Sequence, residues 1–302
     1  MLKFITKLLV LFIVSTNCND LYASPQLPDY IIYKNDTLPT YHLLVEQYLQ
    51  KKYPGDEKLF GLSFRNTLNK DGSVLLSCWR GYQAIYKIEN DSLFLVSIID
   101  CGSIKNFRKG ESNANLSLIF NDKVKNGKVF IDWFKGDISF RLKDKPNEVI
   151  RWDGVFEVIY RFETLISSRN GKITKEEIVE NYLDDPDRIN RKSNYSELSD
   201  ISDVLFEKIK NYKWTRQNEF DCSETYKIRI SINGKIDRVT MLLTDNKWKD
   251  FYSRKEYKHC INFVKKSLSD LQFDIVKRKG KPITEYVFLK LWFDEDRTIE
   301  KW

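Results

Sequence analysis

The chain has 302 residues, of which 42% are hydrophobic and 31% charged, and its formal net charge is +7. This length suits two domains, and the hydrophobic fraction excludes a mainly disordered chain. Lysine and arginine are scattered among carboxylates without a long basic run. The composition therefore argues against binding to nucleic acid or directly to an anionic membrane.

Residues 1–23 have the pattern of a signal peptide. A basic stretch precedes the apolar run 8–14, and Ala23 offers a small-residue cleavage site. That run is short for a membrane-spanning helix. The alternative to cleavage after Ala23 is a lipoprotein signal. Cys18 closely follows the apolar run and is a candidate lipidation site that would tether the protein by a lipid anchor. Either reading predicts export to the periplasm, the outer membrane or the cell surface.

Four further cysteines remain in the exported part of the chain. An even number of cysteines in an oxidising compartment predicts disulfide bonds. Proximity along the chain favours the pairs Cys78 with Cys101 and Cys222 with Cys260. A metal site or a nucleophilic cysteine is the weaker reading, because the chain has no CxxC pair and only two histidines. We therefore expect no cofactor, no metal site and no catalytic residue.

A β-hairpin is expected where the alternating segments 76–88 and 93–101 flank a polar turn. With Glu89 and Asn90 at the centre of the turn, Cys78 would lie directly opposite Cys101. This register predicts a cross-strand disulfide.

The rest of the front half also reads as mostly β. We expect a short edge strand at 29–33, a helix capped by Thr40 and closed by Pro54-Gly55, a second hairpin over 128–142, and a long strand from Phe156. His42 lies off the apolar stripe of the helix and is expected to be solvated. Residues 25–171 are therefore predicted to form an antiparallel β domain with one helix.

Residues 172–195 read as a short helix followed by a linker. Thr174-Lys-Glu-Glu177 has the form of a capping box, and the polar segment 184–195 contains Pro186 and many charges. Asp184, Asp185 and Asp187 resemble the start of a calcium loop, but the glycine and glutamate of that loop are missing. A solvated linker is the preferred interpretation.

Residues 196–302 predict a small α+β domain. A helix begins at Ser196, and Asn233-Gly234 joins two alternating runs, which is a strong hairpin signal. Ser253-Arg-Lys-Glu256 is a capping box for a helix over 254–268. A final strand covers 283–293. Because the front half is mostly β with one helix and this unit combines strands with helices, we expect the whole chain to belong to the α+β class.

This C-terminal quarter resembles the C-terminal domain of TonB-type proteins. The matching segments are Asn233-Gly234-Lys235-Ile236, the helix 254–268, Phe273, and Gly280-Lys281-Pro282-Ile283 ahead of the last strand. The resemblance implies a protein-binding module whose sheet edge can accept a partner's extended segment. The long Pro-rich linker of a transducing TonB is absent, since the chain has 7 prolines. The Trp79-Arg80-Gly81-Tyr82 segment resembles uncharacterised exported bacterial proteins.

Three functional readings follow from these features. The leading one is an exported, non-enzymatic binding protein whose partner is a protein or a glycan. The second is an inhibitor or immunity-type protein that caps another protein. The third is a glycan-acting hydrolase, for which Asp132 and Asp153 are candidate carboxylates without a spacing signature. The tryptophans Trp79, Trp133 and Trp152 could form a sugar-binding platform, although aromatic residues on strands more often belong to the core.

Overall fold

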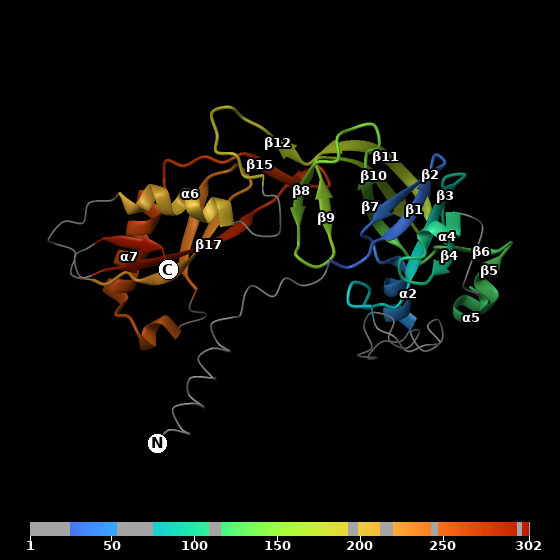
Figure 1. Ribbon diagram of the computed structural model, residues 1–302, viewed down its shortest axis with the longest axis horizontal. Helices are drawn as coiled ribbons and strands as arrows, with labels where there is room; N and C mark the ends of the chain where they lie inside the picture. The colour runs from blue at the N-terminus through green and yellow to red at the C-terminus, as the bar shows by residue number, and fades with distance from the viewer. Residues whose placement is uncertain are drawn as a thin grey trace, which may run out of the picture.

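The structure is a computed structural model that describes residues 25–52, 75–108, 116–192, 199–211, 220–242, 247–294 and 298–301. The expected signal peptide, Cys18 and the Pro54-Gly55 stop lie outside the described residues. The described part of the chain is α+β and mostly β, as expected (Figure 1).

A closed β-barrel, which was not predicted, forms the front of the chain (Figure 1). Its seven strands in ring order are β1 (Asp29–Tyr33), β2 (Asp36–Thr40), β7 (Lys135–Arg141), β10 (Phe162–Arg169), β11 (Lys172–Glu180), β4 (Ser92–Ile99) and β3 (Gln83–Glu89). The ring closes where Lys172 of β11 pairs with Ser92 of β4. Strands β1 and β3 are parallel, and their neighbours are antiparallel. The strand expected at 29–33 is present, but it is not an edge strand, because β1 has a partner on both sides.

Two-residue turns join several of these strands, and their backbone geometry fixes the register. Asn90 and Asp91 both have φ of +50°, as do Asn170 and Gly171 at +50° and +75°. Positive φ at both central residues suits the right-handed twist of a hairpin. The first hairpin is confirmed, but its turn is centred on Asn90 and Asp91, one residue later than expected.

The disulfide between Cys78 and Cys101 forms despite this change of register. Its Cα atoms are 6.2 Å apart. A bulge between Ile85 and Tyr86 shifts the pairing, and β3 begins only at Gln83, so Cys78 lies in the turn ahead of the strand. The predicted cross-strand geometry is wrong and the predicted pair is right.

The expected hairpin over 128–142 is wrong. Strand β6 (Lys128–Phe130) pairs with β4 and with β5 (Val124–Lys125), whereas β7 pairs with β10 and β2. Between β4 and β5 the chain also forms the short helices α4 (Ile104–Arg108), α5 (Ser117–Phe120) and η1 (Asn121–Lys123).

The short helix expected from Thr174 is also wrong, since β11 covers this segment. The Asn170-Gly171 turn folds β11 back along β10, and eight residue pairs align from Phe162 opposite Glu180 to Arg169 opposite Lys172. The Thr174 hydroxyl donates to the Ser167 carbonyl across the pair and caps no helix. Backbone pairing across the hairpin overrides the local capping pattern.

Helix α2 (Leu44–Lys52) closes one end of the barrel core. Its Leu44, Val45 and Leu49 are buried with the inward side chains of the strands, as the sequence predicts. Thr40 does not cap this helix, because it ends strand β2 and donates to the Ser139 carbonyl.

A buried carboxylate ties the helix to the barrel. Asp29 is fully buried and accepts from Arg80 at 2.7 Å, from the Ala84 amide at 2.9 Å and from the Tyr86 hydroxyl at 2.8 Å. The Tyr86 hydroxyl in turn accepts from the first two amides of α2, those of Leu44 and Val45. Because every oxygen of Asp29 is paired, its charge is tolerated in the core.

The C-terminal unit is a four-stranded antiparallel sheet with helices on one face. The strand order is β14 (Ile236–Met241), β13 (Glu224–Ile230), β17 (Glu285–Phe293) and β18 (Ile299–Lys301). The helices are α6 (Ser199–Lys210) and α7 (Arg254–Ser267), and a short helix η2 (Lys247–Asp250) precedes α7. The expected Ser253/Glu256 capping box and Asn233-Gly234 hairpin are both present. Gly234 has φ of +79°, and an added Cβ would lie 2.0 Å from the Phe273 carbonyl oxygen.

The two halves meet at a small shared sheet, where Figure 1 places β12 beside β15. Strand β12 (Tyr182–Leu183) pairs with β15 (Ile275–Arg278), which pairs with β16 (Lys281–Pro282). The ribbon of β8 (Val149–Trp152) and β9 (Val158–Tyr160) lies nearby. It joins the C-terminal sheet through Arg151, which forms a two-contact ion pair with Glu285 of β17 at 2.6 and 2.9 Å.

The described part of the expected linker is held against the C-terminal unit. The Ile189 amide donates to the Gln272 carbonyl, and the Asp274 amide donates back to the Ile189 carbonyl. The carboxylate of Asp184 pairs with Arg161 and Lys192. Residues 184–192 therefore form a strap that is hydrogen-bonded to the C-terminal unit, although Asp184, Pro186, Asp187 and Asn190 are exposed.

The Asp29 network generates a stability prediction. Replacing Asp29 with Asn should lower the free energy of unfolding by about 3 kcal/mol or more, because Arg80 would be left buried without a carboxylate. The matched control on the same hairpin is Asp36→Asn, whose pair with Lys143 is exposed and should contribute less than about 1 kcal/mol. Urea denaturation of both variants checks this, and equal losses would contradict it.

The junction between the two halves generates a second stability prediction. Arg191 is fully buried, 3.4 Å from Glu285, and its guanidinium has no hydrogen-bond partner among the described residues. Burial lowers the pKa of this guanidinium. We expect Arg191→Met to leave the free energy of unfolding unchanged or to raise it. Arg151→Met should lower the free energy of unfolding by about 3 kcal/mol, because Glu285 loses its two-contact partner. Urea denaturation of both variants measures these changes. Equal destabilisation by the two substitutions would refute this reading.

Candidate protein-binding surface

The outer face of the C-terminal sheet carries a row of exposed aromatic side chains. Along β17, Val287, Leu289 and Leu291 are buried, while the alternate residues point to the other face. Three of those alternate residues are Tyr286, Phe288 and Trp292, which are 43%, 48% and 46% exposed. The two-residue period of a strand places them in one line.

The helices leave this face uncovered within the described part of the chain. Helix α6 contacts β17 and helix α7 contacts β14 (Figure 1). Their apolar residues form one core with the inward residues of the sheet, for example Leu205 and Val264 with Leu289. Both helices therefore pack on the inner face, and the aromatic row faces solvent. Large apolar side chains exposed together on one sheet face are typical of interaction sites.

Basic residues surround the aromatic row. On β13, Lys227 lies opposite Phe288 and Arg229 opposite Tyr286. The Lys227 ammonium lies 4.4 Å from the centre of the Tyr286 ring. Lys290 and Arg238 add two more positive charges to the face.

The acidic residues on this face are fewer. Asp237 is paired with Arg229 at 2.7 Å, and this pair holds the pKa of Asp237 below its usual value. Glu300 lies opposite Trp292 on β18. Among the described residues of this face, the four basic side chains outnumber these two carboxylates.

One edge of the sheet is occupied by the chain itself. Strand β18 pairs with β17 from Leu291 to Phe293. The Ser202 hydroxyl of α6 donates to the Phe288 carbonyl further along β17. These contacts reduce the room for strand addition at this edge of the sheet.

The predicted disulfide residues are joined as expected. Cys222 and Cys260 have Cα atoms 5.4 Å apart, and their bond links the start of β13 to helix α7. This bond holds the inner face of the sheet against its helix. Within the described ranges, no group of three or more His, Cys, Asp or Glu side chains is placed to hold a metal ion.

The tryptophans do not form one platform. Trp133 packs against the barrel core between Tyr48 and Phe120, and its indole donates to the Leu44 carbonyl at 2.9 Å. Trp152 ends strand β8, and Trp79 lies in a turn next to the first disulfide. The exposed aromatic row was missed, although the alternation over 283–293 was visible in the sequence.

The two carboxylates considered for a hydrolase have structural roles. Asp132 forms an exposed ion pair with Lys123 at 2.9 Å. Asp153 accepts from the amides of Val155 and Phe156 and so stabilises the turn between β8 and β9.

His42 is half-buried and not solvated as expected. Its Nε2 accepts from the Ser139 amide at 3.0 Å. Burial, and then the charges of Lys279 and Arg278, lower its pKa from 6.5 to about 3. The neutral imidazole is a structural acceptor that links the segment ahead of α2 to strand β7.

No protein-family model, curated protein or solved structure matches this chain. The TonB-type resemblance therefore stays a prediction from the sequence pattern. No helix in the described part of the chain is long and apolar enough to cross a membrane.

His42 predicts how stability depends on pH. The unfolded chain binds a proton on this residue below its ordinary pKa of 6.5, whereas the folded chain does so only near pH 3. Its contribution to stability is complete above pH 6.5 and is lost as the pH falls. Between pH 6 and 4, His42→Gln should reduce the pH slope of the unfolding free energy by up to about 1.4 kcal/mol per pH unit. Parallel curves for the two proteins would refute this.

Proposed function

We propose that this protein is an exported, non-enzymatic binding protein, and that the outer face of its C-terminal sheet binds an acidic surface on another protein. The observation that carries the proposal is the row of Tyr286, Phe288 and Trp292 beside basic residues. Tyrosine, tryptophan and arginine are the residues that contribute most to protein interfaces.

A protein partner suits the composition of this face. An interface typically has an apolar, aromatic centre and a polar rim that sets orientation. Here Tyr286 and Phe288 follow each other on the outer face of β17, and Lys290 lies between Phe288 and Trp292, while Lys227 and Arg238 lie on the neighbouring strands. The partner would place apolar groups on the aromatic row and carboxylates at its margin.

The excess of positive charge selects the kind of partner. A second copy of the same face would bring like charges together, which costs several kcal/mol and disfavours a face-to-face dimer. An acidic surface is complementary and would also accelerate association at low salt.

The compartment supports the same reading. Two disulfides fit an oxidising location outside the cytoplasm. We place the protein in the periplasm or at the cell surface, where a disulfide-stabilised binding module can meet its partner.

The test compares capture by matched variants. Wild-type protein should co-purify with one stoichiometric partner from its native envelope fraction, and the Phe288→Ser/Trp292→Ser double variant should not. Loss of two aromatic contacts should weaken binding about 1,000-fold, since each contributes about 2 kcal/mol. The control is Phe251→Ser, which removes a 72% exposed aromatic side chain from a different part of the unit.

Charge reversal then tests the acidic partner with that captured protein. Lys290→Glu should slow association and flatten its dependence on salt, measured by surface plasmon resonance between 50 and about 300 mM salt. Retention of the partner by the double serine variant would overturn the assignment of the face. An unchanged salt dependence in Lys290→Glu would overturn the acidic complement.

A further inference from the structure

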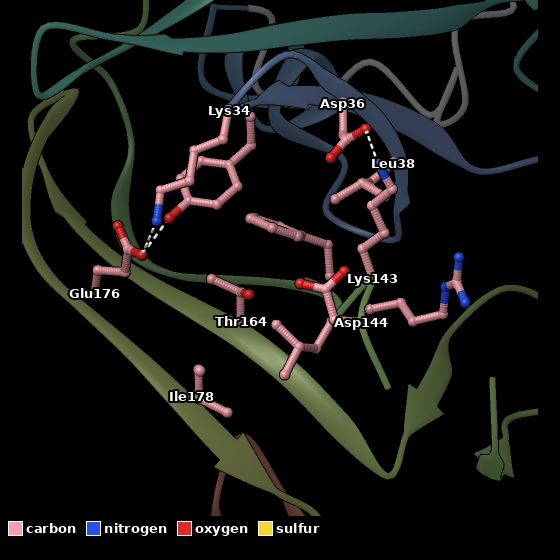
Figure 2. A pocket seen from close by; sticks show the side chains of 12 residues that line it. Lys34, Asp36, Leu38, Lys143, Asp144, Thr164, Glu176 and Ile178 are labelled. Atoms are coloured by element: carbon pink, nitrogen blue, oxygen red, sulfur yellow. Dashed lines mark hydrogen bonds and ion pairs between the residues drawn. The ribbon is translucent and has the colours of Figure 1, made fainter. Parts of the chain in front are cut away.

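The barrel end opposite helix α2 is hollow. A cavity of about 390 Å³ opens beside the β1–β2 turn (Figure 2). Strands β1, β2, β7, β10 and β11 all contribute lining residues. Its size is at the lower end of the range for small-molecule sites.

The inward side chains of three adjacent strands line the cavity. Ile178 of β11, Thr164 of β10 and Phe140 of β7 are direct neighbours across three adjacent strands. The Phe140 ring also contacts the ring of Tyr33, with centroids 5.2 Å apart. Because these residues share the inward face of the barrel, they present one surface to whatever enters the mouth.

The rim is charged, and its charges cancel. The cavity is lined by three cations and three carboxylates, from Lys34, Arg141, Lys143, Asp36, Asp144 and Glu176. Figure 2 shows Lys34 directed to Glu176 on one side and Lys143 directed to Asp36 on the other, at 2.8 and 2.6 Å. A rim of zero net charge does not select an ionic ligand.

Several polar groups at the cavity retain unused hydrogen-bonding capacity. The Thr164 side chain is nine-tenths buried and faces the cavity, and its hydroxyl has no hydrogen-bond partner among the described residues. Glu176 uses one carboxylate oxygen for both Lys34 and Tyr33, which leaves its other oxygen as an acceptor. These two contacts hold the pKa of Glu176 below its ordinary value, so this acceptor is ionised at neutral pH.

We propose that the mouth of the barrel binds a neutral oligosaccharide. A sugar ring has an apolar face of C–H groups, which suits Phe140 and Ile178. Its hydroxyl groups both donate and accept, so that neighbouring hydroxyls can pair with a carboxylate and with an ammonium of the rim. Thr164 supplies a group of the same kind at the floor, where an apolar ligand would leave it unpaired.

Other ligand classes fit less well. A charged ligand gains no net attraction from a rim whose three cations and three carboxylates cancel, and a purely apolar ligand would have to desolvate the ion pairs of the rim. This site lies on the barrel, and its proposal does not depend on the sheet face of the C-terminal unit.

The experiment uses the full chain on an array of neutral oligosaccharides, with acidic oligosaccharides and short neutral peptides as comparison probes. The wild-type protein should bind at least one neutral oligosaccharide, and titration calorimetry should then give its dissociation constant. Thr164→Val, which keeps the shape and removes the hydroxyl, should weaken binding about 10-fold or more. Ile178→Trp, at a 67% exposed position of the mouth, should abolish binding by filling the cavity.

The matched control is Ile232→Trp, which adds the same ring at a 56% exposed position outside the cavity and should bind like wild type. Exclusive binding of acidic sugars or of peptides would overturn the ligand class. Neutral-sugar binding that survives Ile178→Trp would overturn the site. The Phe288→Ser/Trp292→Ser variant should still bind the oligosaccharide, so the failure of one proposal is distinguishable from the failure of the other.

Discussion

The barrel depends on one buried carboxylate. Asp29 lies at the start of β1, yet its oxygens hold Arg80 from the turn next to the first disulfide, the amide of Ala84 and the hydroxyl of Tyr86. The first amides of helix α2 donate to the Tyr86 hydroxyl and so join the same network. A charged pair of this kind is costly to bury and costly to break, so it specifies which segments meet at this end of the barrel. Helix α2 packs on the core at one end of the barrel, and the other end contains the cavity.

The proposed binding surfaces lie on the two halves, and the junction connects them. The strap at 184–192 and the shared strands β12 and β15 carry backbone hydrogen bonds from the barrel to the C-terminal sheet. The ion pair of Arg151 and Glu285 adds a buried contact at the first residue of β17, the strand that bears the aromatic row. The two proposed binding surfaces are thus connected through this junction.

Local signals in the sequence predicted the elements whose geometry is decided locally. The Asn233-Gly234 turn and the Ser253/Glu256 capping box specify their own backbone, and both are present. The disulfide pairs were predicted from chain proximity. The Thr174 pattern misled because a capping box is a local preference, whereas β11 is fixed by its pairing with β10. The closure of the barrel could not be predicted from the sequence. Ile31 pairs with Tyr86 across 55 residues, and neither segment contains a local signal that specifies the other as its partner. The cavity at the mouth follows from that closure and was hidden for the same reason.

The most direct test of the sheet face as a binding surface is hydroxyl-radical footprinting of the protein in its native envelope fraction, compared with the purified protein. The account predicts that Tyr286, Phe288 and Trp292 are labelled in the purified protein and protected in the envelope. Phe251, which is exposed on the same unit, should be labelled in both. Equal labelling of the three aromatic residues in the two samples would contradict the account, because a face that meets its partner in the envelope must lose contact with water there.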